Sequence, residues 1–318
     1  MSRLYTSAAF RIARLSPFRP ACAIRQYSSG TRLTLAYDHH TPSKDGRDVT
    51  DSPIIVMHGL FGSKKNNRGI SKSLVLTWKS SSSLNRVLAQ KLNRHVFAID
   101  LRNHGESPHD HKHDYTAMAD DVAGFIEEHK LVQPSLLGHS MGAKAAMALA
   151  LAQPTLVRDI VSVDNAPVNA ILESSFGKYV QGMKRIEEAG VTKQSEADKI
   201  LQDYEQELPV RQFLLGNLHR PSPADPQQKF RVPLSILGRQ LDQMGGFPFT
   251  DPDRARFERP ALFVRGTKSK YVPDEVIPLI GRFFPRFQLV DVDAGHWLIS
   301  EKPEEFLKAV IEFLEPKE

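Results

Sequence analysis

Short apolar runs alternate with stretches of helical spacing over most of the chain. The apolar runs are three to five residues long, as in strands that are buried on both faces of a parallel sheet. They lie at residues 33–37, 54–57, 96–99, 135–137, 160–163, 262–265 and 288–292. Helical spacing follows at residues 118–129, 143–152 and 304–314. This alternation predicts a doubly wound α/β fold with a mostly parallel sheet.

One long segment interrupts the alternation, at residues 168–258. It is helical at first and then rich in residues that break helices, namely Pro209, Pro221, Pro223, Pro226, Pro233, Gly245, Gly246 and Pro248. A segment of this length between two core strands is more often functional than idle. We therefore predict a cap at 168–258, and a catalytic core formed by residues 28–167 and 259–318.

A second insertion is predicted at residues 73–86, which include a run of four serines. Its deletion would join residues 70–72 to 87–89 in continuous helical register. We assign it no chemistry.

The first 27 residues differ in composition from the rest. They contain five arginines and no acidic residue, with scattered apolar residues, which is typical of a mitochondrial transit peptide. The Tyr27-Ser28 bond, with Arg25 two residues before it, resembles a matrix-protease site. We therefore expect a mitochondrial protein, in the matrix or associated with the inner membrane.

The same segment accounts for the basicity of the chain. Its five arginines equal the whole formal net charge of +5, so the remaining sequence predicts no nucleic-acid surface. Its Cys22 is the single cysteine of the chain, so the mature protein has no thiol for a disulfide, a thiolate zinc site or a nucleophile. No run of about 18 apolar residues occurs, and we expect no transmembrane segment.

Gly138-His139-Ser140-Met141-Gly142 has the pattern of a nucleophile elbow. It follows an apolar run and precedes a helical stretch, as the strand-turn-helix geometry of that motif requires. Small residues must flank the serine because its backbone is strained in this turn. We predict Ser140 as a nucleophile.

A serine needs a base within hydrogen-bond reach to act as a nucleophile. His296 follows the last predicted strand and precedes the final helix, which is the expected place of the triad histidine. We predict His296 as this base.

The acidic partner has two candidate positions. After the strand at 262–265, where many such enzymes place the acid, the chain has Ser269, and the nearby Asp274 has the position of a helix N-terminal residue. The alternative is Asp164, directly after the strand at 160–163. We favour Asp164 and keep Asp274 as the alternative.

The oxyanion of a tetrahedral intermediate needs two backbone donors. One is the residue after the nucleophile, Met141. The other belongs to the loop His58-Gly59-Leu60-Phe61-Gly62, where we favour Leu60 over Phe61. His58 is expected to brace this loop by hydrogen bonding rather than to act as a second base.

Two polar segments remain. Residues 100–107 form a dense polar turn that we expect to support the oxyanion loop. The alternating histidines and aspartates of residues 109–114 resemble a metal-binding pattern, but we interpret them as a solvated loop without a metal.

With these residues in place, the chain resembles the α/β-hydrolase superfamily. Within it, residues 58–63, the block 100–107, the elbow and Val163-Asp164 resemble the group of alpha/beta hydrolase domain-containing protein 11, bacterial esterases and the yeast mitochondrial ethanol acetyltransferases. The resemblance covers nearly all of residues 33–314. It implies an eight-stranded sheet with the cap after strand 6, and a triad acid after the sixth strand, at Asp164.

We therefore expect a serine hydrolase that needs no cofactor and hydrolyses small carboxylic esters or thioesters through an acyl-enzyme on Ser140. One alternative is alcohol acyltransfer, with acyl-CoA as donor and a short alcohol as acceptor. Another is a non-catalytic mitochondrial protein that binds a partner. A carboxylate-dependent dehalogenase or epoxide hydrolase is disfavoured by a serine at the elbow.

Overall fold

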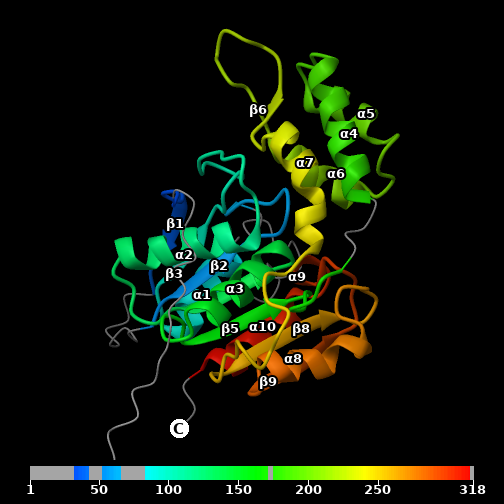
Figure 1. Ribbon diagram of the computed structural model, residues 1–318. Helices are drawn as coiled ribbons and strands as arrows, with labels where there is room; N and C mark the ends of the chain where they lie inside the picture. The colour runs from blue at the N-terminus through cyan, green and yellow to red at the C-terminus, as the bar shows by residue number, and fades with distance from the viewer. Residues whose placement is uncertain (1–31, 43–51, 66–82, 171–174, 316–318) are drawn as a thin grey trace, which may run out of the picture.

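A seven-stranded sheet forms the centre of the computed structural model, which describes residues 32–42, 52–65, 83–170 and 175–315 (Figure 1). The strands are β1 (Tyr37–His40), β2 (Ile54–Met57), β3 (Val96–Ile99), β4 (Ser135–His139), β5 (Asp159–Val163), β8 (Ala261–Gly266) and β9 (Phe287–Val292). Their order is β1-β3-β2-β4-β5-β8-β9, in which β1 is antiparallel to β3 and the other pairs are parallel. The doubly wound α/β fold is confirmed.

Two details of the predicted sheet are wrong. In the described residues the central sheet has seven strands, where eight were predicted, and β1 begins at Tyr37, where the predicted first strand ends. The amides of Leu33 and Ala36 donate to side chains, Asp121 Oδ1 and Ser107 Oγ, at 2.8 Å each. The amides of both residues therefore donate to side chains, although the Ala36 carbonyl still accepts from the backbone amide of Asp100 at 2.8 Å.

Helices cover both faces of the sheet because side chains alternate along each strand. Ile55 and Met57 of β2 pack in the core shared with α2 (Tyr115–Glu128), α3 (Met141–Ala152) and α8 (Ile277–Phe283). Ile54 and Val56 pack in the core shared with α1 (Leu84–Leu92), α9 (Leu298–Glu301) and α10 (Pro303–Leu314). A short 3-10 helix, η3 (Asp274–Val276), precedes α8.

The chain between β5 and β8 forms a helical segment beside the core. It contains α4 (Ser175–Glu188), α5 (Gln194–Leu201), α6 (Leu208–Leu215) and α7 (Leu234–Gly245), with a two-stranded pair of β6 (Leu218–His219) and β7 (Lys229–Phe230). Figure 1 shows these helices gathered together on one side of the sheet. The prediction that this segment becomes loop-rich is wrong at α6 and α7, since Pro209 and Pro233 lie at helix starts, where proline is tolerated.

The end of α7 is bonded to the core. Tyr115 Oη donates to the Met244 carbonyl at 2.8 Å, and Lys144 Nζ donates to the carbonyls of Gly245 and Gly246 at 2.9 Å each. Inside the helix these three carbonyls have no N–H group to accept from, because they lie at its C-terminal end. The cation of Lys144 also faces the negative end of the α7 dipole.

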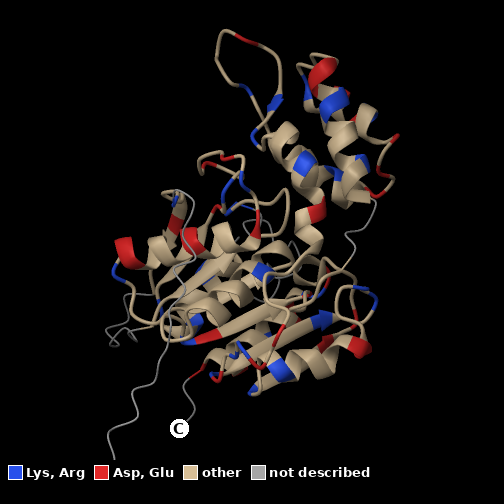
Figure 2. Cartoon of the chain, in the orientation of Figure 1, with Lys and Arg blue, Asp and Glu red and all other residues tan. Residues whose placement is uncertain are grey.

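Several expectations concern residues outside the described ranges. The leader at 1–27 and residues 73–82 of the second insertion are among them, whereas Leu84, Asn85 and Arg86 belong to α1. Among the described elements, Figure 2 shows acidic and basic residues interspersed along the chain. No helix in the described ranges is long and apolar enough to cross a bilayer.

Candidate active site

Ser140 lies in a sharp turn between β4 and α3. Its backbone has φ 54° and ψ −112°, and its amide donates to Val163 O at 2.9 Å. A Cβ atom on Gly138 would lie 2.2 Å from Gly142 O, and one on Gly142 would lie 2.6 Å from Met57 O. Both flanking positions therefore require glycine, as the elbow pattern predicts.

The structure brings Ser140, His296 and Asp164 together in one hydrogen-bonded chain. His296 Nε2 lies 3.0 Å from Ser140 Oγ, and His296 Nδ1 lies 2.7 Å from Asp164 Oδ2. Each residue follows the carboxyl end of a parallel strand, β4, β5 or β9, and these ends meet at one edge of the sheet. With the Nδ1 proton facing the carboxylate, Nε2 can accept the proton of the serine hydroxyl.

The Asp164 carboxylate is fully buried and is held by two further donors. Gly266 N donates to Oδ1 at 3.1 Å, and Ser269 Oγ donates to Oδ2 at 2.5 Å. Ser269 follows β8, the other strand end considered for the acid, and its hydroxyl donates to Asp164 at the end of the neighbouring strand. The Asp164 backbone has φ 51°, which an aspartate tolerates better than a branched residue.

The alternative acid, Asp274, points elsewhere. Its carboxylate pairs with Arg265 Nη1 at 2.5 Å, and its side chain is 80% exposed. The structure therefore brings Asp164 to His296 and leaves Asp274 at the surface.

Three residues that contact Ser140 or His296 were not predicted from the sequence. The Tyr271 ring stacks on the His296 ring, with centroids 4.0 Å apart and planes 19° apart. His139 Nε2 donates to His296 O at 2.9 Å, and Asn165 Nδ2 donates to Ser140 O at 3.1 Å. His139 and Asn165 directly adjoin Ser140 and Asp164 in sequence, which is the signal that could have identified them.

His139 is held neutral by its surroundings. Burial, and then the neighbouring His296, lower its pKa to about 4. A neutral ring with its proton on Nε2 is the form that donates to the His296 carbonyl.

Met141 and Leu60 lie beside Ser140, and both line the same small cavity. Met141 is the first residue of α3, so its amide has no acceptor within the helix. The Phe61 amide donates to His104 Nε2 at 3.0 Å, so this N–H is already engaged. Of the two loop donors that the sequence left open, Phe61 is thereby disfavoured and Leu60 remains.

The His58 ring connects the same loop to Leu101 by hydrogen bonds. Its Nε2 accepts from the Leu101 amide at 3.0 Å, and its Nδ1 donates to Gly59 O at 2.8 Å. Burial lowers its pKa, which keeps the ring neutral. The predicted bracing role of His58 is consistent with both contacts.

Hydrogen bonds join the polar turn at residues 100–107 to Lys64, directly after the loop at residues 58–63. Asp100 accepts from the Lys64 ammonium at 2.9 Å and from the Lys64 amide at 2.6 Å, and both side chains are buried. Glu106 accepts from the same ammonium at 2.6 Å, and its hydrogen bonds to Lys64 and Lys65 lower its pKa to about 2. The expectation that this turn supports the loop agrees with these contacts.

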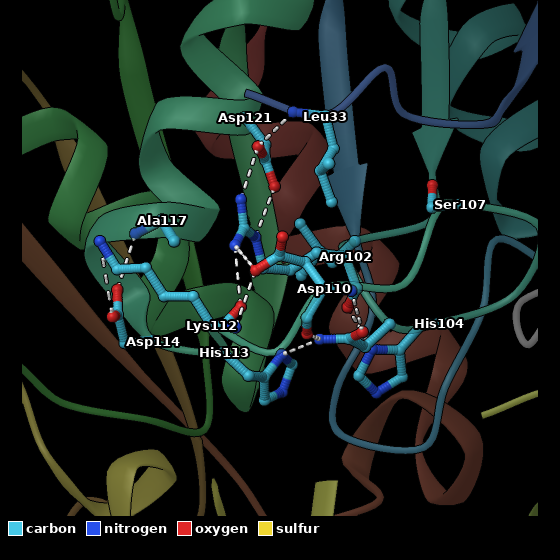
Figure 3. A network of polar contacts seen from close by, with 12 residues as sticks. Leu33, Arg102, His104, Ser107, Asp110, Lys112, His113, Asp114, Ala117 and Asp121 are labelled. Carbon is cyan, nitrogen blue, oxygen red and sulfur yellow. Dashed lines mark hydrogen bonds and ion pairs between the residues drawn. The ribbon is translucent and has the colours of Figure 1, made fainter. Parts of the chain in front are cut away.

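A second buried network continues from the same turn toward α2 (Figure 3). The Arg102 guanidinium forms two hydrogen bonds with Asp121, at 2.7 and 2.9 Å, and both side chains are almost fully buried. His113 is also buried, and its Nδ1 lies 3.2 Å from Asn103 Nδ2. Asp114 caps α2 by accepting from the Ala117 amide.

The interpretation of residues 109–114 as a solvated loop is therefore wrong for His113. One histidine of the run, His113, lies in the interior, where burial lowers its pKa to about 3. In the described residues, no group of three metal-binding side chains is close enough to hold an ion.

Two cavities meet at Ser140. The smaller has a volume of about 20 Å³ and is lined by residues that include Leu60, Met141, Lys144 and Tyr271. The larger has a volume of about 890 Å³ and extends between the loop at residues 58–63, α6 and Trp297. Ser140 therefore borders both the small cavity and the large one.

Comparisons with known proteins agree with this architecture. A family model described as "alpha/beta hydrolase fold" matches residues 52–303. The "Probable alcohol acetyltransferase" of Saccharomyces cerevisiae is 40% identical over 282 residues, 84% of this chain and 78% of that protein. The "sn-1-specific diacylglycerol lipase ABHD11" of Mus musculus is 37% identical over 272 residues, 84% of this chain and 82% of that protein.

Among solved structures, "Marine microorganism esterase" superposes with a TM-score of 0.73 at 28% sequence identity, over 88% of this chain and 99% of that one. The family match covers well over half of the chain, and the fold, the strand order and the elbow agree with it. The predicted resemblance is confirmed: the chain belongs to the α/β-hydrolase family.

Proposed function

We propose that this protein is a serine-dependent acyl-transfer enzyme that cleaves carboxylic esters or thioesters through an acyl-enzyme on Ser140. The observation that carries the proposal is the continuous chain from Ser140 Oγ through His296 to Asp164, at 3.0 and 2.7 Å. A serine at its ordinary pKa is a poor nucleophile, and a base at this distance removes that limit.

The reaction proceeds in two steps. His296 Nε2 takes the hydroxyl proton while Ser140 Oγ bonds to the carbonyl carbon, and the amides of Leu60 and Met141 stabilise the oxyanion. The imidazolium then protonates the leaving alcohol or thiol, and an acyl-serine ester remains. In the second step His296 deprotonates the acceptor, which attacks the acyl-serine ester and releases the product and the free serine.

Water is the acceptor that we favour, which gives an esterase or thioesterase. An alcohol as acceptor would give ester synthesis, with acyl-CoA as donor, and the relative named "Probable alcohol acetyltransferase" supports this as a second candidate. We propose that residues 168–258 act as a cap whose α6 borders the larger cavity, so the cap would control how much water reaches the acyl-serine.

The proposal is tested with a fluorophosphonate probe and with product analysis. The wild-type protein should be labelled and Ser140→Ala should not be, since labelling requires the activated serine. Equal labelling of both proteins, or a folded wild type that is not labelled, would contradict it. Acetyl thioester turnover with and without ethanol then separates free acid from ethyl ester as the product.

We also propose a mitochondrial location from residues 1–27, whose composition is that of a transit peptide. Fusion of residues 1–40 to a fluorescent protein should direct it to mitochondria, and replacement of the five arginines by glutamine should abolish import. A cytosolic signal from the unaltered fusion would refute this location.

A further inference from the structure

The loop at residues 58–63, which the proposed mechanism uses to bind the oxyanion, contains a strained turn. Phe61 has φ 60°, a left-handed conformation that residues other than glycine rarely adopt. The Gly62 amide donates to Gly59 O at 2.9 Å, and a Cβ atom on Gly62 would lie 2.8 Å from that oxygen. A turn of this kind persists only where the surrounding contacts enforce it.

Two side chains from different parts of the molecule hold the Phe61 backbone. From the core, His104 Nε2 accepts from the Phe61 amide at 3.0 Å. From the proposed cap, Asn217 Nδ2 donates to Phe61 O at 2.7 Å. Asn217 is buried and lies between α6 and β6. The Phe61 ring also faces the cap, since its centroid lies 6.1 Å from that of Phe176 on α4.

The Asn217 amide group is fixed in its orientation. Its NH₂ group donates to Phe61 O and, at 3.3 Å, to Leu214 O, and a carbonyl oxygen can only accept. The backbone of Asn217 is anchored as well, because its amide donates to Leu214 O at 3.1 Å and its carbonyl accepts from the Arg231 amide at 3.0 Å. The donor is therefore a fixed part of the cap.

A chain of two peptide groups leads from Asn217 to the predicted oxyanion donor. The Phe61 carbonyl and the Gly62 N–H belong to one planar peptide group, and the Gly59 carbonyl and the Leu60 N–H belong to another. Asn217 donates to the oxygen of the first group, whose N–H donates to the oxygen of the second. The chain ends at the Leu60 N–H. Because hydrogen bonds in such a chain polarise one another, the Asn217 donor strengthens this N–H and also fixes its direction.

We propose that Asn217 is a positioning residue through which the cap completes the oxyanion site, since its bond to Phe61 O sets the direction and the donor strength of the Leu60 amide. The inference rests on the proposed function, because it concerns the oxyanion that forms at Ser140. The cap then does more than control the access of water. Acyl transfer is fast only while Asn217 contacts the loop.

A role of Asn217 as a mere anchor of the cap makes a different prediction. Asn217 lines the larger cavity, so loss of an anchor would weaken every ligand in that cavity alike. Loss of a positioned Leu60 amide weakens only a ligand that carries an oxyanion. A trifluoromethyl ketone is such a ligand: Ser140 Oγ bonds to its carbonyl carbon, the hydroxyl proton passes to His296, and the ketone oxygen becomes the oxyanion. The corresponding methyl ketone binds without this step.

The test measures inhibition of 4-nitrophenyl acetate hydrolysis by heptan-2-one and by 1,1,1-trifluoroheptan-2-one. The measured quantity is the Ki of the methyl ketone divided by the Ki of the trifluoromethyl ketone. Asn217→Asp keeps the shape of the side chain, but at pH 8 it directs a carboxylate oxygen at Phe61 O in place of the donor. Removal of one oxyanion donor costs about 10²- to 10³-fold in rate, so a displaced donor should lower this ratio at least tenfold, and kcat/KM with it.

Asn169→Asp is the matched control, because it makes the same chemical change at an exposed residue of the proposed cap. The oxygen of Asn169 accepts from the Phe247 amide at 2.7 Å, and this acceptor survives the substitution. The control should alter the ratio less than threefold.

A second variant keeps the test decisive if Asn217→Asp does not fold, as judged by circular dichroism. Asn217→Leu has a similar branched shape, removes the donor without adding a charge and leaves no room for a water molecule in its place. The same fall of at least tenfold is expected. A smaller fall in the ratio for the folded variant, which includes an equal loss of affinity for both ketones, overturns the inference.

The two proposals fail in distinguishable ways. If Ser140→Ala hydrolyses 4-nitrophenyl acetate as fast as wild type, the proposed function itself is wrong. If Ser140 is required but the ratio does not respond to Asn217, the acyl-transfer function stands and the positioning role alone is refuted.

Discussion

Replacement of Asp164 by asparagine tests the hydrogen-bonded chain at its buried end. Asparagine keeps the shape of the side chain but has one acceptor oxygen in place of two. The carboxylate accepts from three donors, His296 Nδ1, Ser269 Oγ and Gly266 N. The amide oxygen can satisfy the Gly266 amide, and the NH₂ group then faces His296.

An NH₂ group in that position requires an acceptor on His296 Nδ1. The imidazole proton therefore moves to Nε2, and the ring loses the lone pair that accepts the Ser140 proton. In a serine protease, which is the measured example of this change, the equivalent substitution lowers kcat about 10⁴-fold. We expect a loss of 10³- to 10⁴-fold, or roughly 4 to 5.5 kcal/mol of transition-state stabilisation.

The assay is hydrolysis of 4-nitrophenyl acetate, with circular dichroism to check that the variants are folded. Asp274→Asn is the matched control, because it makes the same chemical change in a side chain that is 80% exposed and paired with Arg265. We expect it to change kcat less than threefold. Asp164 is not the residue that orients His296 if Asp164→Asn keeps more than a tenth of the wild-type kcat, or if Asp274→Asn loses as much activity as Asp164→Asn.

Three further outcomes follow from the buried polar groups and the elbow. Arg102→Met leaves the Asp121 carboxylate buried without its partner, so the free energy of unfolding in urea should fall by about 3–5 kcal/mol, and a fall below 1 kcal/mol would contradict the network's role. His113 has a folded-state pKa of about 3, below its unfolded value, so its contribution to stability is complete above pH 6.5 and is lost as the pH falls toward 3. Between pH 6.5 and pH 5 the wild type should therefore lose about 2 kcal/mol more than His113→Gln, and equal losses would show that His113 is not the titrating group. Gly142→Ala places a Cβ atom 2.6 Å from Met57 O, so turnover should fall more than a hundredfold, and near-normal turnover would show that the elbow relaxes.

The sequence by itself determined the fold class and most of the strands. β2 and β3 have the predicted bounds, and the later core strands differ from the prediction by one or two residues. A strand of a parallel sheet is covered by helices on both faces, so its ends nearly coincide with the ends of a continuous apolar run. It also predicted that Ser140, Asp164 and His296 follow strand ends. In a parallel sheet those ends share an edge, so three residues far apart in the chain could be expected at one place.

Local patterns failed where long-range contacts outweighed them. Residues 33–36 look like a strand, but Asp121 and Ser107 bind two of their amides. The run at residues 109–114 looks solvated, but the loop folds His113 inward against Asn103. The prolines predicted loops at α6 and α7, but Pro209 lies in the first turn of α6 and Pro233 is the N-cap of α7, and at both positions proline interrupts no helical hydrogen bond.

Only the tertiary structure shows contacts that separate the alternatives which the sequence ranked but left open. Asp164 and Asp274 are both acidic residues near strand ends, and the direction of each side chain separates them, since one faces His296 and the other Arg265. Phe61 and Leu60 are adjacent donors, and the bond from Phe61 to His104 separates them. The charge on Lys144 is visible in the sequence, but its burial beside Ser140 is not. Burial and side-chain direction depend on which segments pack together, and residue order along one segment does not encode that.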